Sequence, residues 1–319
     1  MKIKIPILLL LTALSLSTKA QTVFEDASGE SVLIKNADLK DWFNIRINTA
    51  SESFTLSYIG TRNLKDGQVK NSATEMISRR SMLGFDLKLK VKDGIGNVYK
   101  QGKLNTGISA ALIWGIQKEN YDTKTPIYTR PRSFYLKAGL SYDKYAMLDT
   151  LNYSKTELKK LQPFASLNKN WFYTSKTSND NPVYSLAGIS FGYKVTNNTE
   201  DLDDGIGSTL LGSAPNYSVG KQDAGKLGDY QTYHSFPLRL DYGILPRLFG
   251  KNILGINAFA RAGINEPKTP INLGTGVFFS KDNEPTNVVG GFGWQFNNVV
   301  HKSLMSNSSV FVYIGYTIQ

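Results

Sequence analysis

The chain has 319 residues, a formal net charge of +11 and no cysteine, and it holds 16 Phe, 17 Tyr, 4 Trp and 28 Gly. The lack of cysteine excludes a disulfide framework and a lipid-modified cysteine. Beyond the N-terminal segment no run approaches the ~18 consecutive apolar residues of a membrane-spanning helix, which argues against a helical membrane protein. Many aromatic and glycine residues with modest hydropathy suit strands that are apolar on one face only.

The N-terminus has the pattern of a secretory signal peptide. Lys2 and Lys4 precede a short apolar run, and Ala20 provides a small residue before a cleavage site at Gln21. A membrane anchor would need about 20 apolar residues, and this run is too short. We therefore expect residues 1–20 to be removed on export. Export makes nucleic acid a poor partner for the positive charge, and anionic lipid headgroups or an anion-preferring lumen are better partners.

Alternation of apolar with polar or small residues, at a period of two, is the main signal in the rest of the chain. In the clearest case Leu83 and Phe85 alternate with Gly84 and Asp86. The pattern predicts about 12 strands, within a range of about 10–14. They lie at 42–48, 53–60, 83–91, 106–116, 134–140, 163–173, 183–195, 236–242, 254–264, 272–280, 288–296 and 310–318.

These strands predict an all-β fold, a transmembrane antiparallel β-barrel in the cell outer membrane. Lipid would meet one face of every strand and a wet lumen the other. The expected organisation is a signal peptide at 1–20, a periplasmic N-terminal segment at 21–41 and the barrel at 42–319.

An even number of strands places both termini in the periplasm, where connections are short. Counting back from the C-terminus puts 174–182, 244–251 and 281–285 on that side. The connections 92–105, 142–161, 196–232, 265–271 and 298–308 then fall outside. The N-terminal part fits less well, because 49–52 is short for an outer connection and 61–81 is long for a periplasmic one. Either the first two strands are miscounted, or residues 21–81 include a periplasmic or plug-like segment.

One helix is predicted within the outer connection 142–161. Ser154 and Glu157 have the spacing of a capping box, and Leu158 and Leu161 follow three residues apart.

Charged side chains on the predicted inner faces are the most informative set of site candidates. They could line a narrow water-filled path that favours anions, because basic residues are in excess. They could equally pair with one another and fill the interior as a structural network. The set comprises Arg46, Asp86, Lys88, Lys90, Lys137, Lys194, Arg239, Asp241 and Arg261.

The four tryptophans, Trp42, Trp114, Trp171 and Trp294, are candidates for aromatic girdles at the membrane interfaces. Packing between strands accounts equally well for any one of them.

Catalytic and metal-binding patterns are weak. His234 has Ser235 beside it, but neighbours on a strand point to opposite faces and cannot form a nucleophile–base pair. The acidic cluster at 200–204 lacks the spacing of a calcium loop and is better explained as a solvated loop. We therefore expect no enzyme activity, no metal and no cofactor, and a lipid hydrolase is the least favoured function.

Three consecutive segments near the C-terminus resemble a known group of proteins. Leu273–Phe279, the turn Lys281–Pro285 and the strand Val288–Phe296 resemble the penultimate hairpin of outer-membrane barrel proteins of Gram-negative bacteria. The resemblance is one of architecture and carries no functional residues. The fold that it implies would have outer-membrane lipid, lipopolysaccharide and the outer-membrane assembly machinery as partners.

The basic inner positions favour a passive channel or transporter for small, anionic solutes. The alternative is a structural or surface-interaction barrel with a closed interior, whose connection 196–232 binds a protein partner.

Overall fold

The computed structural model describes Asp26 and residues 42–70, 75–91, 99–100, 103–104, 106–122, 132–149, 154–176, 182–198, 202–214, 217–248, 250–266, 269–281, 284–301 and 307–318. The predicted signal peptide at 1–20, and all of 21–41 except Asp26, lie outside this part. Among the described residues, no helix is long and apolar enough to cross a membrane.

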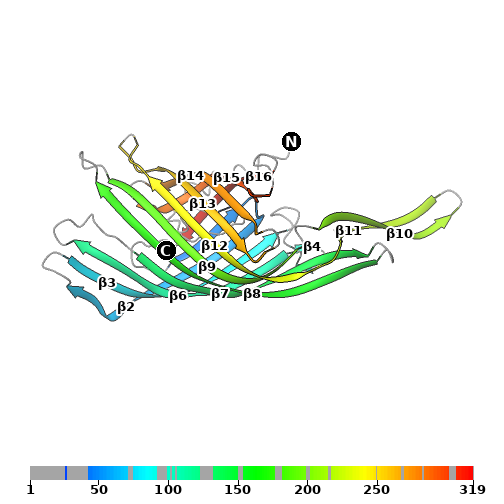
Figure 1. Ribbon diagram of the computed structural model, residues 1–319, viewed down its shortest axis with the longest axis horizontal. Coiled ribbons are helices and arrows are strands. Elements are labelled where there is room, and N and C mark those ends of the chain that lie inside the picture. Colours follow the sequence, from blue (N-terminus) through cyan, green and yellow to red (C-terminus); the bar gives the residue numbers. More distant parts are fainter. Residues whose placement is uncertain are drawn as a thin grey trace.

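Long antiparallel strands make up most of the described chain (Figure 1). Each of the twelve predicted strands is present, and several are longer than predicted. In chain order they are β1 (Trp42–Asn48), β2 (Ser53–Lys70), β3 (Glu75–Val91), β6 (Thr106–Asp122), β7 (Arg132–Asp149), β8 (Ser154–Lys176), β9 (Pro182–Asn197), β12 (Thr232–Leu245), β13 (Leu254–Ile264), β14 (Ile271–Lys281), β15 (Glu284–Phe296) and β16 (Ser308–Ile318). Two further hairpins join β4 (Tyr99–Lys100) to β5 (Lys103–Leu104), and β10 (Asp203–Ala214) to β11 (Tyr217–Leu227).

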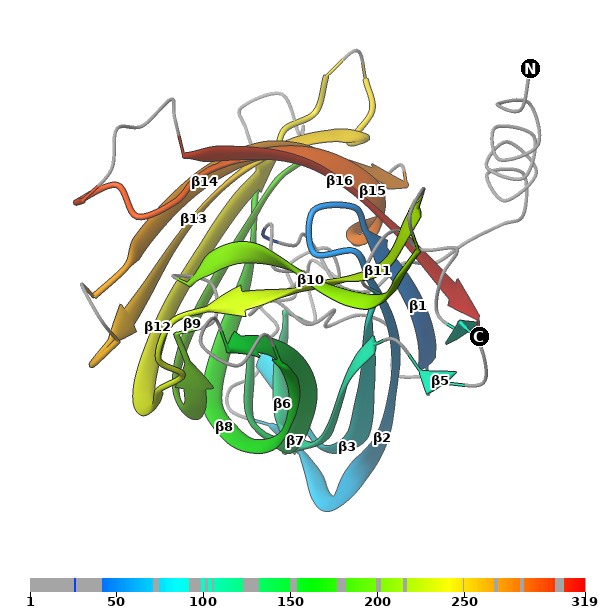
Figure 2. The same cartoon turned by 90° about the vertical axis from the view of Figure 1, so that its right-hand side faces the viewer.

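The twelve strands close into a ring (Figure 2). Its order is β1-β2-β3-β6-β7-β8-β9-β12-β13-β14-β15-β16, and β1 completes it by pairing with β16, from Phe43 opposite Ile318 to Asn48 opposite Tyr313. Every neighbouring pair in the ring is antiparallel. The chain is therefore an all-β antiparallel barrel of the outer-membrane type, as the sequence predicts.

The two ends of the barrel differ in their connections. At one end, which we call the short-turn end, the strands are joined by 71–74, 123–131, 177–181, 246–253 and 282–283. At the other, the long-connection end, the joins include 92–105, 198–231 and 297–307. β1 begins and β16 ends on the side of the short-turn end. The β10–β11 hairpin extends away from the long-connection end (Figure 1).

The outer face of the barrel is apolar. Leu112 on β6 and Val310 on β16 are 68% and 73% exposed, and large exposed hydrophobic side chains recur at alternate positions of every long strand between them. On β7, Phe134 and Leu140 are exposed, whereas Ser133 and Tyr135, on either side of Phe134, are buried. Exposure of such a surface to water would be strongly unfavourable, whereas contact with membrane hydrocarbon is what the outer face of a transmembrane barrel requires.

The inner face combines polar and apolar layers. One cluster of buried hydrophobic side chains comprises Phe172, Leu186, Leu245, Phe259, Phe278, Val288, Phe311 and Tyr313, and a second comprises Ile59, Met82, Ile113 and Tyr135. Phe278 and Leu245 have no exposed area. Gly274 makes room for this packing, because a Cβ there would collide with the Phe259 ring.

Three sequence-based expectations are corrected. The first is the helix near Ser154, which is wrong, since residues 154–161 belong to β8 and pair with Tyr142–Asp149 of β7. A capping pattern is only a local preference, and the ladder to β7 satisfies the same backbone groups along the whole segment. The expected outer connection 142–161 is reduced to 150–153 for the same reason.

The second correction concerns the start of β15. The period-two alternation of 288–296 predicts that Val288 faces lipid together with Phe292 and Trp294, yet Val288 is buried inside, opposite Ser280. The register shifts between Phe279 and Ser280, so one extra residue on β15 reverses the alternation before Gly290.

The third correction concerns residues 61–81, which the sequence predicts to be a long periplasmic connection between the second and third strands. β2 and β3 instead continue as one hairpin, with Lys70 opposite Met76. The first two strands are therefore not miscounted.

Candidate functional site

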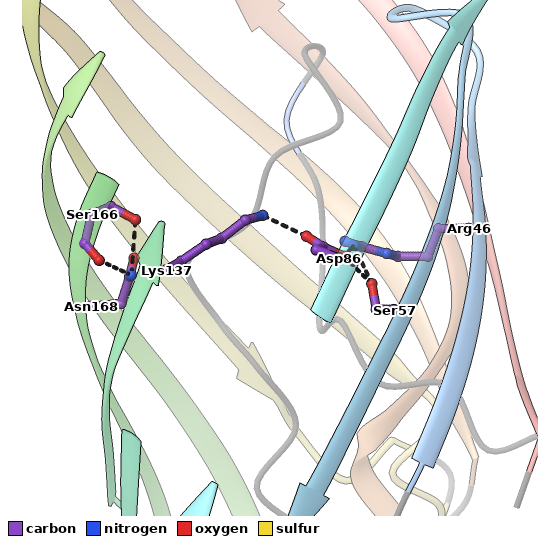
Figure 3. A network of polar contacts seen from close by, with 6 residues as sticks. All are labelled: Arg46, Ser57, Asp86, Lys137, Ser166 and Asn168. Atoms are coloured by element: carbon purple, nitrogen blue, oxygen red, sulfur yellow. Dashed lines mark hydrogen bonds and ion pairs between the residues drawn. The ribbon is translucent and has the colours of Figure 1, made fainter. Parts of the chain in front are cut away.

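Inner polar side chains of β1, β2, β3 and β7 meet at one carboxylate, Asp86 (Figure 3). Arg46 Nη2 lies 3.2 Å from Asp86 Oδ1, and Lys137 Nζ lies 2.5 Å from Asp86 Oδ2. Ser57 also donates a hydrogen bond to Asp86 Oδ1 and accepts one from Arg46 Nη2 at 3.0 Å. Two cations and a hydroxyl therefore share a single buried anion.

Strand register explains part of this arrangement. Arg46 pairs with Thr55 on β2, and Ser57 pairs with Asp86 on β3, so the three inner side chains lie within neighbouring pleats. Lys137 comes from β7, with β6 between it and β3. Its long side chain extends across the interior toward Asp86 (Figure 3). The contact thus joins two parts of the barrel wall that are not neighbours.

A second network surrounds Arg261 on β13. Its Nη2 lies 2.5 Å from Asp241 Oδ1 on β12, and its Nε donates to Asp26 Oδ2 at 2.6 Å. The backbone oxygen of Asp26 accepts a hydrogen bond from Asn48 Nδ2 at 3.0 Å. Asp26, which precedes the first strand of the barrel, is therefore held inside the barrel between β13 and β1.

A third pair lies near the long-connection end. Lys194 Nζ on β9 is 3.0 Å from Glu266 Oε1, in the β13–β14 connection, and Ser235 on β12 also donates to that oxygen. The neighbouring His234 faces the other way and contacts the Tyr193 hydroxyl at 2.7 Å. His234 and Ser235 are thus on opposite faces, as the alternation of a strand requires.

The remaining predicted inner charges differ in how deeply they are buried. Lys88 is buried on β3, Arg239 is half-buried opposite Arg261, and Lys90 is exposed near the end of β3. Sequence reasoning did not identify Asp26 or Glu266, which supply two of the anions. Both lie outside the barrel strands, where a period of two gives no information on facing.

The tryptophans can be placed in part. Trp114 and Trp294 lie on the outer face and are exposed, and Trp171 is half-buried with Lys169 Nζ 5.0 Å from the centre of its ring. Trp42 begins β1, and its side chain lies outside the described part. Their role in interfacial girdles stays a prediction.

The base of the β10–β11 hairpin is fixed to the barrel rim. Lys226 of β11 pairs with Met147 of β7, and the rings of Tyr145 and Tyr230 lie 6.1 Å apart. Asn198 exchanges backbone and side-chain hydrogen bonds with 229–231, at 2.8–3.2 Å. The base of the hairpin is therefore held by β7 and by hydrogen bonds between the two ends of the β9–β12 connection.

Metal-binding groups are not evident in the part of the chain that the structure covers. No three His, Cys, Asp or Glu side chains come close enough there to hold a metal ion. Asp203 and Asp204 from the acidic cluster are consecutive residues of β10 and pair with Leu227 and Lys226.

Comparison with known proteins adds little. No family model and no curated protein matches the chain. Among solved structures it is similar to the β-domain of the Bordetella autotransporter BrkA, with a TM-score of 0.35, 12% sequence identity, and coverage of 87% of this chain and 96% of that chain. A score of this size supports no inference about function, and the barrel assignment rests on the strand pairing described above.

The Asp86 network yields a prediction for stability. In Asp86→Asn, Arg46 and Lys137 lose their shared anion inside the barrel, and removal of one partner of a buried ion pair costs about 3–5 kcal/mol. We expect a loss of that size in the free energy of unfolding, measured by urea titration in lipid vesicles. Glu157→Gln is the matched control, because Glu157 forms an exposed pair with Lys144 at 2.8 Å. Its loss should stay below about 1 kcal/mol, and equal losses in the two variants would contradict the structural role of Asp86.

Proposed function

We propose that the protein is exported, resides in the outer membrane and acts there as a closed structural barrel that presents the β10–β11 hairpin to a protein partner. The observation that carries this proposal is the pairing of the inner charges. Arg46 and Lys137 share Asp86, while Arg261 lies between Asp241 and Asp26. Cations neutralised in this way attract passing anions less strongly than free cations would.

Packing of the interior supports the same function. The buried clusters around Phe278 and Tyr135 place large apolar side chains where a water-filled pore would need open space. Asn170 and Ser235 also have no exposed area on the inner face. A conducting state would require these layers to move apart.

The hairpin is the favoured contact element because of its place and its fixed base. It extends from the long-connection end, which the rule of short periplasmic turns assigns to the cell exterior (Figure 1). Contacts with Tyr145 and Met147 hold its base on the rim. Because its base is fixed, the hairpin loses less conformational entropy on binding a partner than a free loop would.

A channel for small anions is the second candidate. Lys137 and Lys194 retain 22% and 36% of their side-chain area exposed, so part of the basic charge inside the barrel is open to solvent. Loss of the Asp26 carboxylate from Arg261 would add to that charge.

Planar-bilayer recording of the full chain distinguishes the two candidates. A closed barrel gives no current steps, either in the wild type or in Asp26→Asn, because the apolar layers remain. Asp229→Asn, outside the barrel strands and exposed, serves as the control variant. Stable anion-selective steps in the wild type would contradict the closed barrel and favour the channel.

Photo-crosslinking in intact cells tests the interaction role. A photoreactive residue at Tyr217, where β11 begins, should give one discrete adduct with a partner protein. The same residue at exposed Thr269, in the neighbouring β13–β14 connection, is the control and should give none. Absence of an adduct at Tyr217, or the same adducts at both positions, would contradict the proposal.

A further inference from the structure

Five basic residues lie on neighbouring strands of one side of the barrel, toward the short-turn end. They are Arg62 on β2, Arg79 on β3, Lys118 on β6, Arg132 on β7 and Lys169 on β8, and together we call them the basic row. Each occupies a position of its strand that faces outward, and all except the half-buried Lys118 are exposed. These strands lie side by side along the lower part of Figure 1.

The register brings these cations unusually close to one another. Arg79 is directly opposite Lys118, and Lys118 is directly opposite Arg132. Residues opposite one another in antiparallel strands have Cβ atoms about 4.5–5.5 Å apart, and like charges there are destabilising. Arg62 and Lys169 extend the row diagonally, because Arg62 pairs with Ser81 and Lys169 with Phe134.

The basic row lies apart from the ion pairs in the described part of the chain. None of its five members forms an ion pair with a carboxylate there. The other end of the same strands differs, because Lys144 on β7 pairs with Glu157 on β8 at 2.8 Å. A carboxylate therefore neutralises part of the outward charge at that end.

The basic row borders directly on the apolar outer face. Ile116, Phe134 and Leu167 are exposed and lie two residues from Lys118, Arg132 and Lys169 on the same faces of their strands. One step of two residues along a strand is about 7 Å. Beyond Phe134, the outward residues of β7 remain apolar to Tyr142, a stretch of the length that crosses a bilayer. The row thus lies where hydrocarbon gives way to headgroups.

We propose that the basic row binds the headgroup phosphate of an anionic phospholipid. Arg79 and Arg132 flank Lys118, and guanidinium groups bind phosphate oxygens through two parallel hydrogen bonds. A bound phosphate would relieve the repulsion between the three cations, while the acyl chains lie on Ile116 and Phe134. This inference rests on the membrane location proposed above, and it adds a specific lipid site to it.

The position of the row decides between two sources of phosphate in an outer membrane. Short turns mark the periplasmic end, so the adjoining leaflet is the inner one, which is built from phospholipid rather than lipopolysaccharide. The row is also an open surface bordered by apolar side chains, which suits a lipid better than a soluble phosphate.

Native mass spectrometry of the full chain in detergent tests the site, with phosphatidylglycerol and phosphatidylcholine as probes. The wild type should bind phosphatidylglycerol in preference, and added salt should weaken that preference through screening. In the triple variant Arg79→Gln, Lys118→Gln, Arg132→Gln, affinity for phosphatidylglycerol should fall roughly 10- to 100-fold, with phosphatidylcholine binding unchanged.

The matched control carries the same number of charge losses elsewhere on the exposed surface, as Lys155→Gln, Lys159→Gln, Lys251→Gln, and should keep wild-type selectivity. Equal affinity of the two triple variants, or equal binding of both lipids by the wild type, would overturn the site. Should the test variant fail to fold, the wild-type salt titration decides alone.

Competition with glycerol phosphate shows whether the phosphate group is sufficient for binding without acyl chains. Full displacement of the lipid by glycerol phosphate would also contradict the proposal. A folded wild-type barrel without lipid preference would remove the site and leave the membrane location standing.

Discussion

The ladder between β1 and β16 is the constraint on which the rest of the molecule depends. A strand inside hydrocarbon has no water for its backbone groups, so every N–H and C=O must find a partner in another strand. Pairing of Asn48 with Tyr313, and of Phe43 with Ile318, removes the two free edges that twelve strands would otherwise expose. Closure then fixes which side chains face outward, because successive residues must alternate between the two faces.

Closure also creates an enclosed interior that has to be filled or hydrated. This chain fills it with aromatic layers around Phe278 and Tyr135 and with charges arranged in groups of opposite sign. Such groups are costly to separate from one another once they are away from bulk water. Asp26, which precedes the first barrel strand, takes part in one of them through its contact with Arg261. On the outer face, apolar side chains that suit contact with hydrocarbon are bordered by the cations of the basic row.

Much of this fold could be predicted from the sequence, because each strand must be apolar on one face. The alternation of Leu83 and Phe85 with Asp86 identified both the strand and the inner position of the carboxylate. Local patterns failed where pairing overrides them, as at Ser154, or where an extra residue reverses the facing, as at Val288. Lys137 contacts Asp86 across the interior, although another strand, β6, lies between their two strands in the wall. The contact of Asp26 with Arg261 joins residues that are far apart in the chain. No periodicity in the sequence carries this information.

The central claim is that alternate side chains of each strand meet hydrocarbon outside a closed ring and a packed interior within it. Because the chain has no native cysteine, single-cysteine variants from Phe134 to Tyr142 of β7 can each carry one spin label in lipid vesicles. The account predicts that accessibility to oxygen, which dissolves in hydrocarbon, rises and falls with a period of two and is highest at Phe134, Leu136 and Leu140. A uniform profile, or maxima at Tyr135 and Lys137, would contradict it.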